Sequence, residues 1–143
     1  MRSIINIFLP IIAIINLMCS CEKQIDPSEM PHDNRLVGFW VMLNYSDHGR
    51  ADTTIEEYTS NSWHYEYVYS KQKGIYEKTS TEQWYTIDSI HGKTSWKELG
   101  GKRNYSDFYY KLSSKFDTLY DADTNSFLNA YMYVRYKGTL KMN

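Results

Sequence analysis

Cysteine is nearly absent from this sequence, which has only two among its 143 residues. Both of them, Cys19 and Cys21, lie close to the N-terminus. The rest of the chain therefore has no cysteine for a disulfide or for a zinc–thiolate centre. We expect the folded part of the protein to be stabilised by packing alone.

The sequence also lacks an excess of either charge. Its 16 Lys and Arg residues nearly balance its 17 Asp and Glu residues, which gives a formal net charge of -1. Proteins that bind nucleic acids carry clustered positive charge, which neutralises the phosphates. The composition therefore argues against a nucleic acid as the partner of this protein.

Motifs for catalysis and for metal or cofactor binding are missing as well. The four histidines are spread along the chain, and no cysteine follows Cys21. Glu56 and Glu57 are adjacent, and adjacent residues of a strand point to opposite faces, so we interpret them as part of a solvated strand rather than as an acid–base pair. We therefore predict that the protein is not an enzyme and needs no metal or cofactor. The histidines are His32, His48, His64 and His91.

The first 21 residues have the pattern of an export signal. Arg2 supplies a positive charge, and no charged residue occurs from Ser3 to Cys21. This uncharged length also approaches that of a membrane-spanning helix, so an uncleaved anchor is the alternative, although Pro10 and two asparagines interrupt the apolar run. Both interpretations place the following domain at a membrane.

Met18, Cys19, Ser20 and Cys21 resemble the lipobox of bacterial lipoproteins. The resemblance implies a signal peptide of residues 1–20, cleavage after Ser20 and acylation of Cys21, with palmitate as a label for the attached chains. Two or more acyl chains are what stable membrane anchoring requires, so membrane lipid is the expected partner of this residue. Cys19 is the alternative acylation site.

Residues 21–35 are typical of a tether, because they are polar, contain Pro27 and Pro31 and show no apolar periodicity. The three residues from Glu22 to Gln24 resemble the starts of many lipoproteins of the Bacteroidetes. This resemblance implies attachment to the outer membrane, on either its periplasmic or its surface side.

Residues 36–143 are predicted to form one all-β domain. Aromatic residues make up 16% of the chain, and they favour half-buried strands. Turn residues separate short apolar and aromatic runs, and no run has helical spacing, so the pattern predicts a small antiparallel up-and-down barrel of about eight strands. The runs are 36–46, 51–59, 62–70, 74–79, 82–89, 94–99, 105–112, 115–121 and 127–137.

Alternation within these runs predicts which residues point into the barrel. In the run 62–70 the aromatic residues share one face, which we interpret as the inner face, and two later runs have similar one-sided sets. The aromatic set is Trp63, Tyr65, Tyr67 and Tyr69, and the later sets are Phe108, Tyr110 and Leu112, and Leu128, Ala130, Met132, Val134 and Tyr136.

The stretch from Leu36 to Trp40 resembles the opening strand of lipocalin-like domains, in which a Gly-x-Trp motif begins the first strand of the barrel. Gly38 and Trp40 carry this resemblance. It implies that the indole closes one end of the barrel, that the glycine makes room for it, and that a late arginine packs against the tryptophan. Arg135 is the candidate for that arginine by its position.

The aromatic inner face, together with Trp84, is the candidate ligand site. A small eight-stranded barrel either packs solid or holds one small ligand, and buried tyrosine hydroxyls favour a cavity with polar groups. We therefore expect a membrane-anchored lipoprotein that binds a small, partly apolar ligand without catalysis. The alternative is a module with a solid core that binds carbohydrate or protein, in which outward-facing aromatic residues stack on sugar rings.

Overall fold

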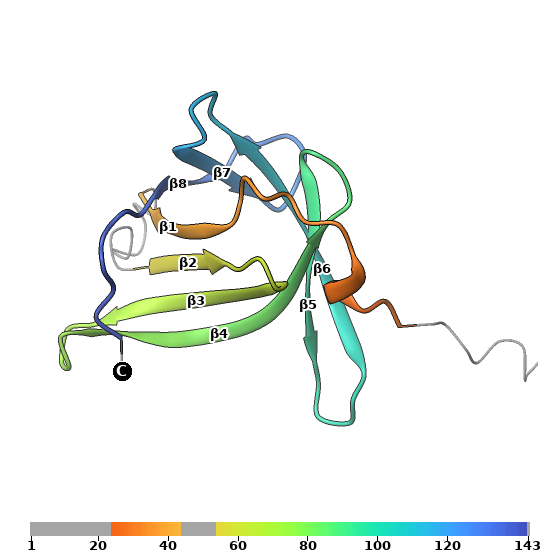
Figure 1. The fold of residues 1–143 in the computed structure, drawn as a ribbon, viewed down its shortest axis with the longest axis horizontal. Coiled ribbons are helices and arrows are strands. Elements are labelled where there is room, and N and C mark those ends of the chain that lie inside the picture. Colours follow the sequence, from red (N-terminus) through yellow and green to blue (C-terminus); the bar gives the residue numbers. More distant parts are fainter. Residues whose placement is uncertain (1–23, 44–53, 143) are drawn as a thin grey trace, which may run out of the picture.

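The computed structural model describes residues 24–43 and 54–142, and its helical and strand elements are shown in Figure 1. The signal peptide, Cys19, Cys21 and His48 lie outside these described residues. One short 3₁₀ helix, η1 (Pro27–Glu29), precedes eight strands. The strands are β1 (Gly38–Met42), β2 (Thr54–Tyr58), β3 (Trp63–Ser70), β4 (Ile75–Thr86), β5 (His91–Lys97), β6 (Arg103–Leu112), β7 (Thr118–Ala122) and β8 (Tyr131–Arg135).

The eight strands form one closed antiparallel barrel, so the predicted fold class is confirmed. Each strand pairs with the next along the chain, and β8 closes the barrel by pairing with β1. Val41 of β1 lies opposite Ile55 of β2 on one side and opposite Val134 of β8 on the other. Closure gives each of the eight strands a partner on both sides over part of its length, which reduces the free edge that would otherwise need protective charges or prolines.

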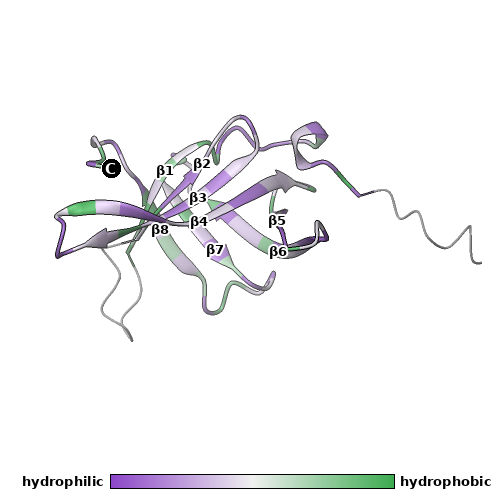
Figure 2. Cartoon of the chain, turned by 90° about the horizontal axis from the view of Figure 1, so that it is seen from below, coloured by the Kyte–Doolittle hydropathy of each residue, from purple (hydrophilic) through white to green (hydrophobic). Residues whose placement is uncertain are grey.

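Strand β4 joins two of the predicted runs into a single strand of 12 residues. The polar residues from Thr79 to Thr81 lie in its middle, where side chains are exposed or half-buried. The loss of apolar alternation there marks solvent exposure and a β-bulge opposite Glu66 and Tyr67 rather than a turn. Figure 2 shows short hydrophobic segments along strands that are otherwise hydrophilic or intermediate.

The tightly packed core fills one end of the barrel and extends to its middle. Trp40, Trp84 and Leu36 have no exposed surface there, and Gly38 makes space for the packing. A Cβ atom at Gly38 would lie 2.8 Å from Nη1 of Arg135, and the glycine has a φ of +132°, which residues with side chains rarely adopt. This end is therefore sealed by side chains. The whole cluster is Leu36, Trp40, Tyr58, Trp84, Phe108, Tyr110, Leu119 and Tyr133.

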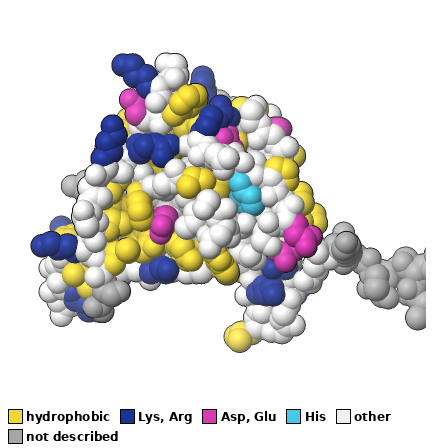
Figure 3. Space-filling view, in the orientation of Figure 1, with side chains coloured by type: hydrophobic (Ala, Val, Ile, Leu, Met, Phe, Trp, Pro, Cys, Tyr) yellow, Lys and Arg dark blue, Asp and Glu magenta, His cyan; other side chains and the backbone are white. Residues whose placement is uncertain are grey.

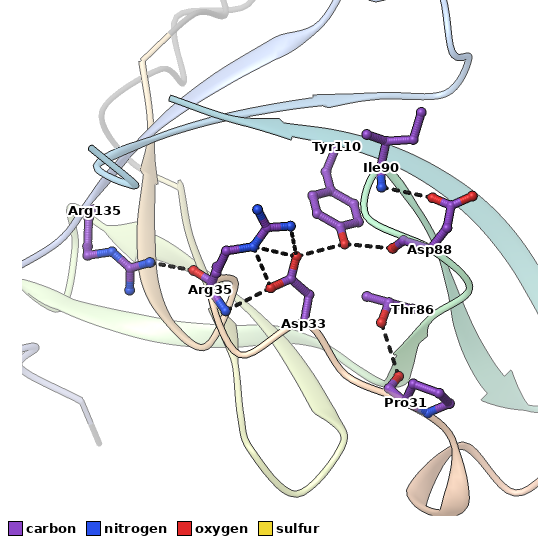
Figure 4. A network of polar contacts seen from close by, with 8 residues as sticks. All are labelled: Pro31, Asp33, Arg35, Thr86, Asp88, Ile90, Tyr110 and Arg135. Atoms are coloured by element: carbon purple, nitrogen blue, oxygen red, sulfur yellow. Dashed lines mark hydrogen bonds and ion pairs between the residues drawn. The ribbon is translucent and has the colours of Figure 1, made fainter. Parts of the chain in front are cut away.

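Residues 31–36 lie across the sealed end, which corrects the expectation that the polar stretch up to residue 35 is a free tether. Asp33 accepts a hydrogen bond of 2.9 Å from the Tyr110 hydroxyl and pairs with Arg35 (Figure 4). Thr86 donates to the carbonyl of Pro31 through both its backbone N–H and its hydroxyl. The polar residues of this stretch make specific hydrogen bonds to the barrel. Composition alone does not distinguish polar residues that bond to the protein from those that bond to water.

Candidate functional site

The other end of the barrel contains a cavity of about 310 Å³. This size lies at the lower limit of small-molecule sites in proteins. The cavity extends from the middle of the barrel to the end where β1 and β7 stop and β8 begins. Its wall has an aromatic part, made by Tyr58, Phe108, Tyr131 and Tyr133, and a polar part, made chiefly by Glu56, His64, Glu66, Glu82 and Asp121.

Strand register brings the polar residues to the inner face. Trp40, which is fully buried in the core, lies opposite Glu56, and Glu56 in turn lies opposite Glu66. One step along the same strands, His64 lies opposite Tyr58 on one side and Glu82 on the other. Residues directly opposite one another in a sheet point to the same face, so this set lines the interior.

The predicted inner aromatic face of β3 is wrong, because Trp63, Tyr65, Tyr67 and Tyr69 lie on the outer side of the barrel. They alternate with His64 and Glu66, which line the cavity. Hydrophobic side chains gather over β1, β2 and β3 on the face seen in Figure 3. Aromatic residues on an outer face alternate in the sequence just as they do on an inner face. The alternation therefore predicted the strand correctly but not which of its faces points into the barrel.

These outer aromatic residues have partners of their own. The Tyr67 side chain is almost fully buried, and its hydroxyl donates a 2.6 Å hydrogen bond to Glu57. The Nζ of Lys78 lies 3.6 Å from the ring centre of Tyr65, which stacks on Trp63 with a ring separation of 6.3 Å. Tyr69 is 37% exposed. None of the four lines the cavity described above.

Trp84 and Trp40 belong to the sealed end rather than to the cavity. The Trp84 indole N–H donates to the carbonyl of Thr59 at 3.1 Å, and that of Trp40 donates to the carbonyl of Leu36 at 2.7 Å. Arg135 covers the Trp40 ring, with its guanidinium carbon 4.2 Å from the ring centre.

The set of residues predicted to face inward along β8 is shifted by one position. Tyr133 is only 2% exposed and lies in the core, whereas Leu128 is 85% exposed and precedes the strand. Arg135 thus shares a face with Tyr133 and lies opposite Trp40. The aliphatic residues of this run did not predict which face points inward, because a tyrosine and an arginine form the inner face.

Glu56 is the centre of the polar wall. It is buried, whereas the sequence predicted a solvated side chain. Its carboxylate accepts hydrogen bonds from the hydroxyls of Tyr133 at 2.6 Å and Tyr58 at 3.3 Å. His64 Nε2 lies 3.4 Å from the same carboxylate. Burial acts to raise the pKa of Glu56, but these neighbours outweigh it and hold the pKa below its usual value.

His64 is held beside this carboxylate without a hydrogen bond of its own. Both ring nitrogens are inaccessible to solvent, and neither has a hydrogen-bond partner among the described residues. Burial acts to lower the pKa of His64, but the nearby Glu56 and Glu82 carboxylates raise it above the usual value. The Glu56 carboxylate, 3.4 Å from Nε2, therefore compensates the burial of this imidazole by its charge.

Asp121 faces the same cavity from β7. Burial, together with the negative charge of Glu56, raises the pKa of Asp121 to about 7. The two carboxyl groups therefore differ in their proton affinity, with Glu56 ionised and Asp121 titrating near neutral pH. Sequence analysis missed this group, because Asp121 lies at the end of its run among the turn residues 121–125 and resembles one of them.

A second groove, of about 470 Å³, lies on the outside of the barrel. It contains Trp63 and Trp96, the latter 39% exposed. Arg103 crosses its floor and donates to Gln83 Oε1 at 2.5 Å and to Ser95 Oγ at 2.9 Å. Two tryptophans beside polar side chains are the components of a sugar-stacking surface.

No protein-family model and no curated protein sequence matches this chain. Among the described residues, no group of three or more His, Cys, Asp or Glu side chains is arranged to hold a metal ion. No helix within residues 24–43 and 54–142 is long and apolar enough to cross a membrane.

Proposed function

We propose that this protein is a lipid-anchored protein of the bacterial cell envelope whose barrel binds a small ligand without catalysis. The observation that carries the proposal is the cavity of about 310 Å³, which combines an aromatic wall with the polar side chains of Glu56, His64 and Asp121. A largely formed pocket with a few convergent polar groups is typical of small-molecule sites. The aromatic walls favour a ligand that is partly apolar.

Native mass spectrometry of the full chain, purified from its own envelope fraction, tests ligand binding. We expect a bound small molecule in the wild type and none in Thr94→Phe, because Thr94 lines the cavity and the added ring would fill it. Lys111→Phe is the matched control, since Lys111 is exposed on the same barrel. A wild-type protein without ligand, or equal occupancy in Thr94→Phe, would contradict the proposal.

Metabolic labelling with palmitate tests the anchor. The resemblance of residues 18–21 to a lipobox supports acylation at Cys21. We expect label in the wild type and in Cys19→Ala, and no label in Cys21→Ala. Label that persists in Cys21→Ala would assign the anchor to another residue or reject it.

Carbohydrate binding at the outer groove is the second candidate function, and the exposed Trp96 beside Trp63 favours it. Alanine substitution of stacking aromatic residues weakens sugar binding strongly when the rings form the platform. Affinity electrophoresis in gels with soluble polysaccharides would show retarded wild-type protein and unretarded Trp96→Ala. Equal mobility with and without polysaccharide would reject this function.

A further inference from the structure

We infer that the ligand of the barrel cavity is a small organic cation, an amine or a quaternary ammonium, a conclusion that rests on the proposed binding function. Four carboxyl groups face the cavity against one imidazole, and none of the described residues that line it is Lys or Arg. The facing groups are Glu56 on β2, His64 and Glu66 on β3, Glu82 on β4 and Asp121 on β7.

Two further carboxylates border the cavity without adding to the charge inside it. Asp107 lies on the outer side, where it pairs with His91 at 2.7 Å and Lys93 at 3.0 Å and is about half exposed. Asp123 is exposed just beyond the end of β7. The negative character of the interior therefore comes from the four inward carboxyl groups.

The protein's own hydrogen bonds satisfy these four unequally, and Glu66 accepts one of 3.1 Å from the Thr79 hydroxyl. Glu56 has two tyrosine hydroxyls and the neighbouring His64. Glu82, by contrast, has a weak 3.5 Å contact with Ser80, and its other oxygen lies 4.0 Å from His64 Nδ1. Carboxylates gathered in a cavity are costly unless a positive charge or donors compensate them, and a bound cation would supply the charge.

A protonated His64 does not remove this excess. One imidazolium would balance one carboxylate, and Glu66, Glu82 and Asp121 would still face the same space. The elevated pKa of Asp121 has the same origin, since burial and the charge of Glu56 disfavour its ionised form. A cation in the cavity would reverse this effect, so binding would release a proton from Asp121.

The aromatic wall fits the same class of ligand. Tyr58 and Phe108 have ring centres 6.1 Å apart, and Tyr131 and Tyr133 complete that side of the cavity. Aromatic ring faces attract ammonium groups, and they also bury the apolar part of an amine. Carboxylates on one side and rings on the other thus match a compact amphipathic cation better than a neutral apolar molecule.

Isothermal titration calorimetry of the full chain with benzylamine and benzyl alcohol tests the inference, because the two probes differ mainly in charge. We expect benzylamine to bind at least about tenfold more tightly than benzyl alcohol at neutral pH. Asp121→Asn should weaken benzylamine binding about tenfold and leave benzyl alcohol unchanged. Asp107→Asn, which removes the same charge from the outer side, should change neither affinity.

The outcomes separate this inference from the binding function on which it rests. Equal affinities for the two probes, or equal losses of both in Asp121→Asn, would overturn charge selection and leave a cavity that binds neutral molecules. Binding of neither probe would overturn the cation inference, and the co-purification experiment would then decide the binding function separately. Titrations in buffers of different ionisation enthalpy should also show proton release with benzylamine alone.

Discussion

Asp121 illustrates how a single carboxyl group in the cavity makes the stability of the fold depend on pH. Its pKa is about 7 in the folded protein and 3.8 in an unperturbed chain. Between these values the folded state holds a proton that the unfolded state has released, so stability falls as the pH rises through this range. Above the folded pKa both states are ionised and the full cost of burying the charge is present.

Asp121→Asn should therefore stabilise the protein at neutral and higher pH by about 2 to 4 kcal/mol, and change little near pH 4. His64 acts in the same direction, because its raised pKa contributes stability that is lost as the pH rises through its folded pKa. Urea unfolding at several pH values measures both effects. Asp123→Asn is the exposed control, and an equal gain there would contradict the assignment to Asp121.

Arg135 is the residue that ties the sealed end together. It donates from Nη1 to the carbonyl of Val37, from Nη2 to that of Arg35 and from Nε to that of Phe116, at 2.9, 2.6 and 3.1 Å. It also covers the Trp40 ring, where burial lowers the pKa of the guanidinium. One side chain thus connects the first strand, the last strand and the segment that precedes the barrel.

Arg135→Met should lower the free energy of unfolding by about 2 to 4 kcal/mol, because it removes three hydrogen bonds and leaves backbone carbonyls without their donors. Thermal unfolding followed by tryptophan fluorescence is the measurement, since the loss should also change the emission of Trp40. Lys137→Met removes a charge from an exposed position nearby and should have little effect. Similar losses in both variants would argue against the role of Arg135.

At the scale of single strands, the sequence predicted where strands occur better than which face of each strand points into the barrel. Phe108 and Tyr110 of β6 were correctly assigned to the core from their alternation. The same reasoning failed for β3, where aromatic residues crowd the outer face and the inner face carries His64 and Glu66. Burial of charged residues inside a barrel contradicts the usual hydrophobic pattern, and such exceptions concentrate at functional sites.

The segment of residues 31–36 is the element that sequence composition described least well. Asp33 accepts bonds from the backbone N–H and side chain of Arg35 and from the hydroxyl of Tyr110, and its own carbonyl accepts from the N–H of Leu36 at 2.9 Å. These bonds place the buried Leu36 side chain in the core.

Asp33→Ala should therefore loosen this segment and destabilise the protein by about 1 to 3 kcal/mol. Amide hydrogen exchange should accelerate at Leu36 more than at residues in the middle of β6, because the segment opens before the barrel does. Asp26→Ala removes an aspartate that bonds only within its own turn to Ser28, and it serves as the control. Unchanged exchange at Leu36 in Asp33→Ala would contradict this role.

At the scale of the whole molecule, the barrel class was predictable from short alternating runs and the Gly38–Trp40 motif, and closure explains why. Each strand pairs with its neighbour in sequence, so local order along the chain determines the topology. The position of the cavity was not predictable, because it depends on the register that places Glu56, His64 and Glu82 side by side.

Closure also makes β8 an interior strand. Val134→Pro should disrupt β8, because Val134 lies between Val41 of β1 and Thr118 of β7 and proline tolerates only edge positions. We expect a loss of about 3 kcal/mol or more in urea unfolding. Lys137→Pro, placed beyond the strand, is the control. Tolerance of proline at Val134 would mean that β8 behaves as an edge and that the barrel is open in solution.

Residues 31–36 close one end of the barrel, so its two ends differ. The chain enters the barrel at the sealed end, and in Figure 1 this N-terminal segment lies on the right while the turn between β3 and β4 lies on the left. The cavity opens toward the end where β1 stops and β8 begins. Attachment through Cys21, as proposed, would therefore hold the closed side of the barrel toward the bilayer. The entrance would face the surrounding medium, where a water-soluble cation could reach it without passing through lipid.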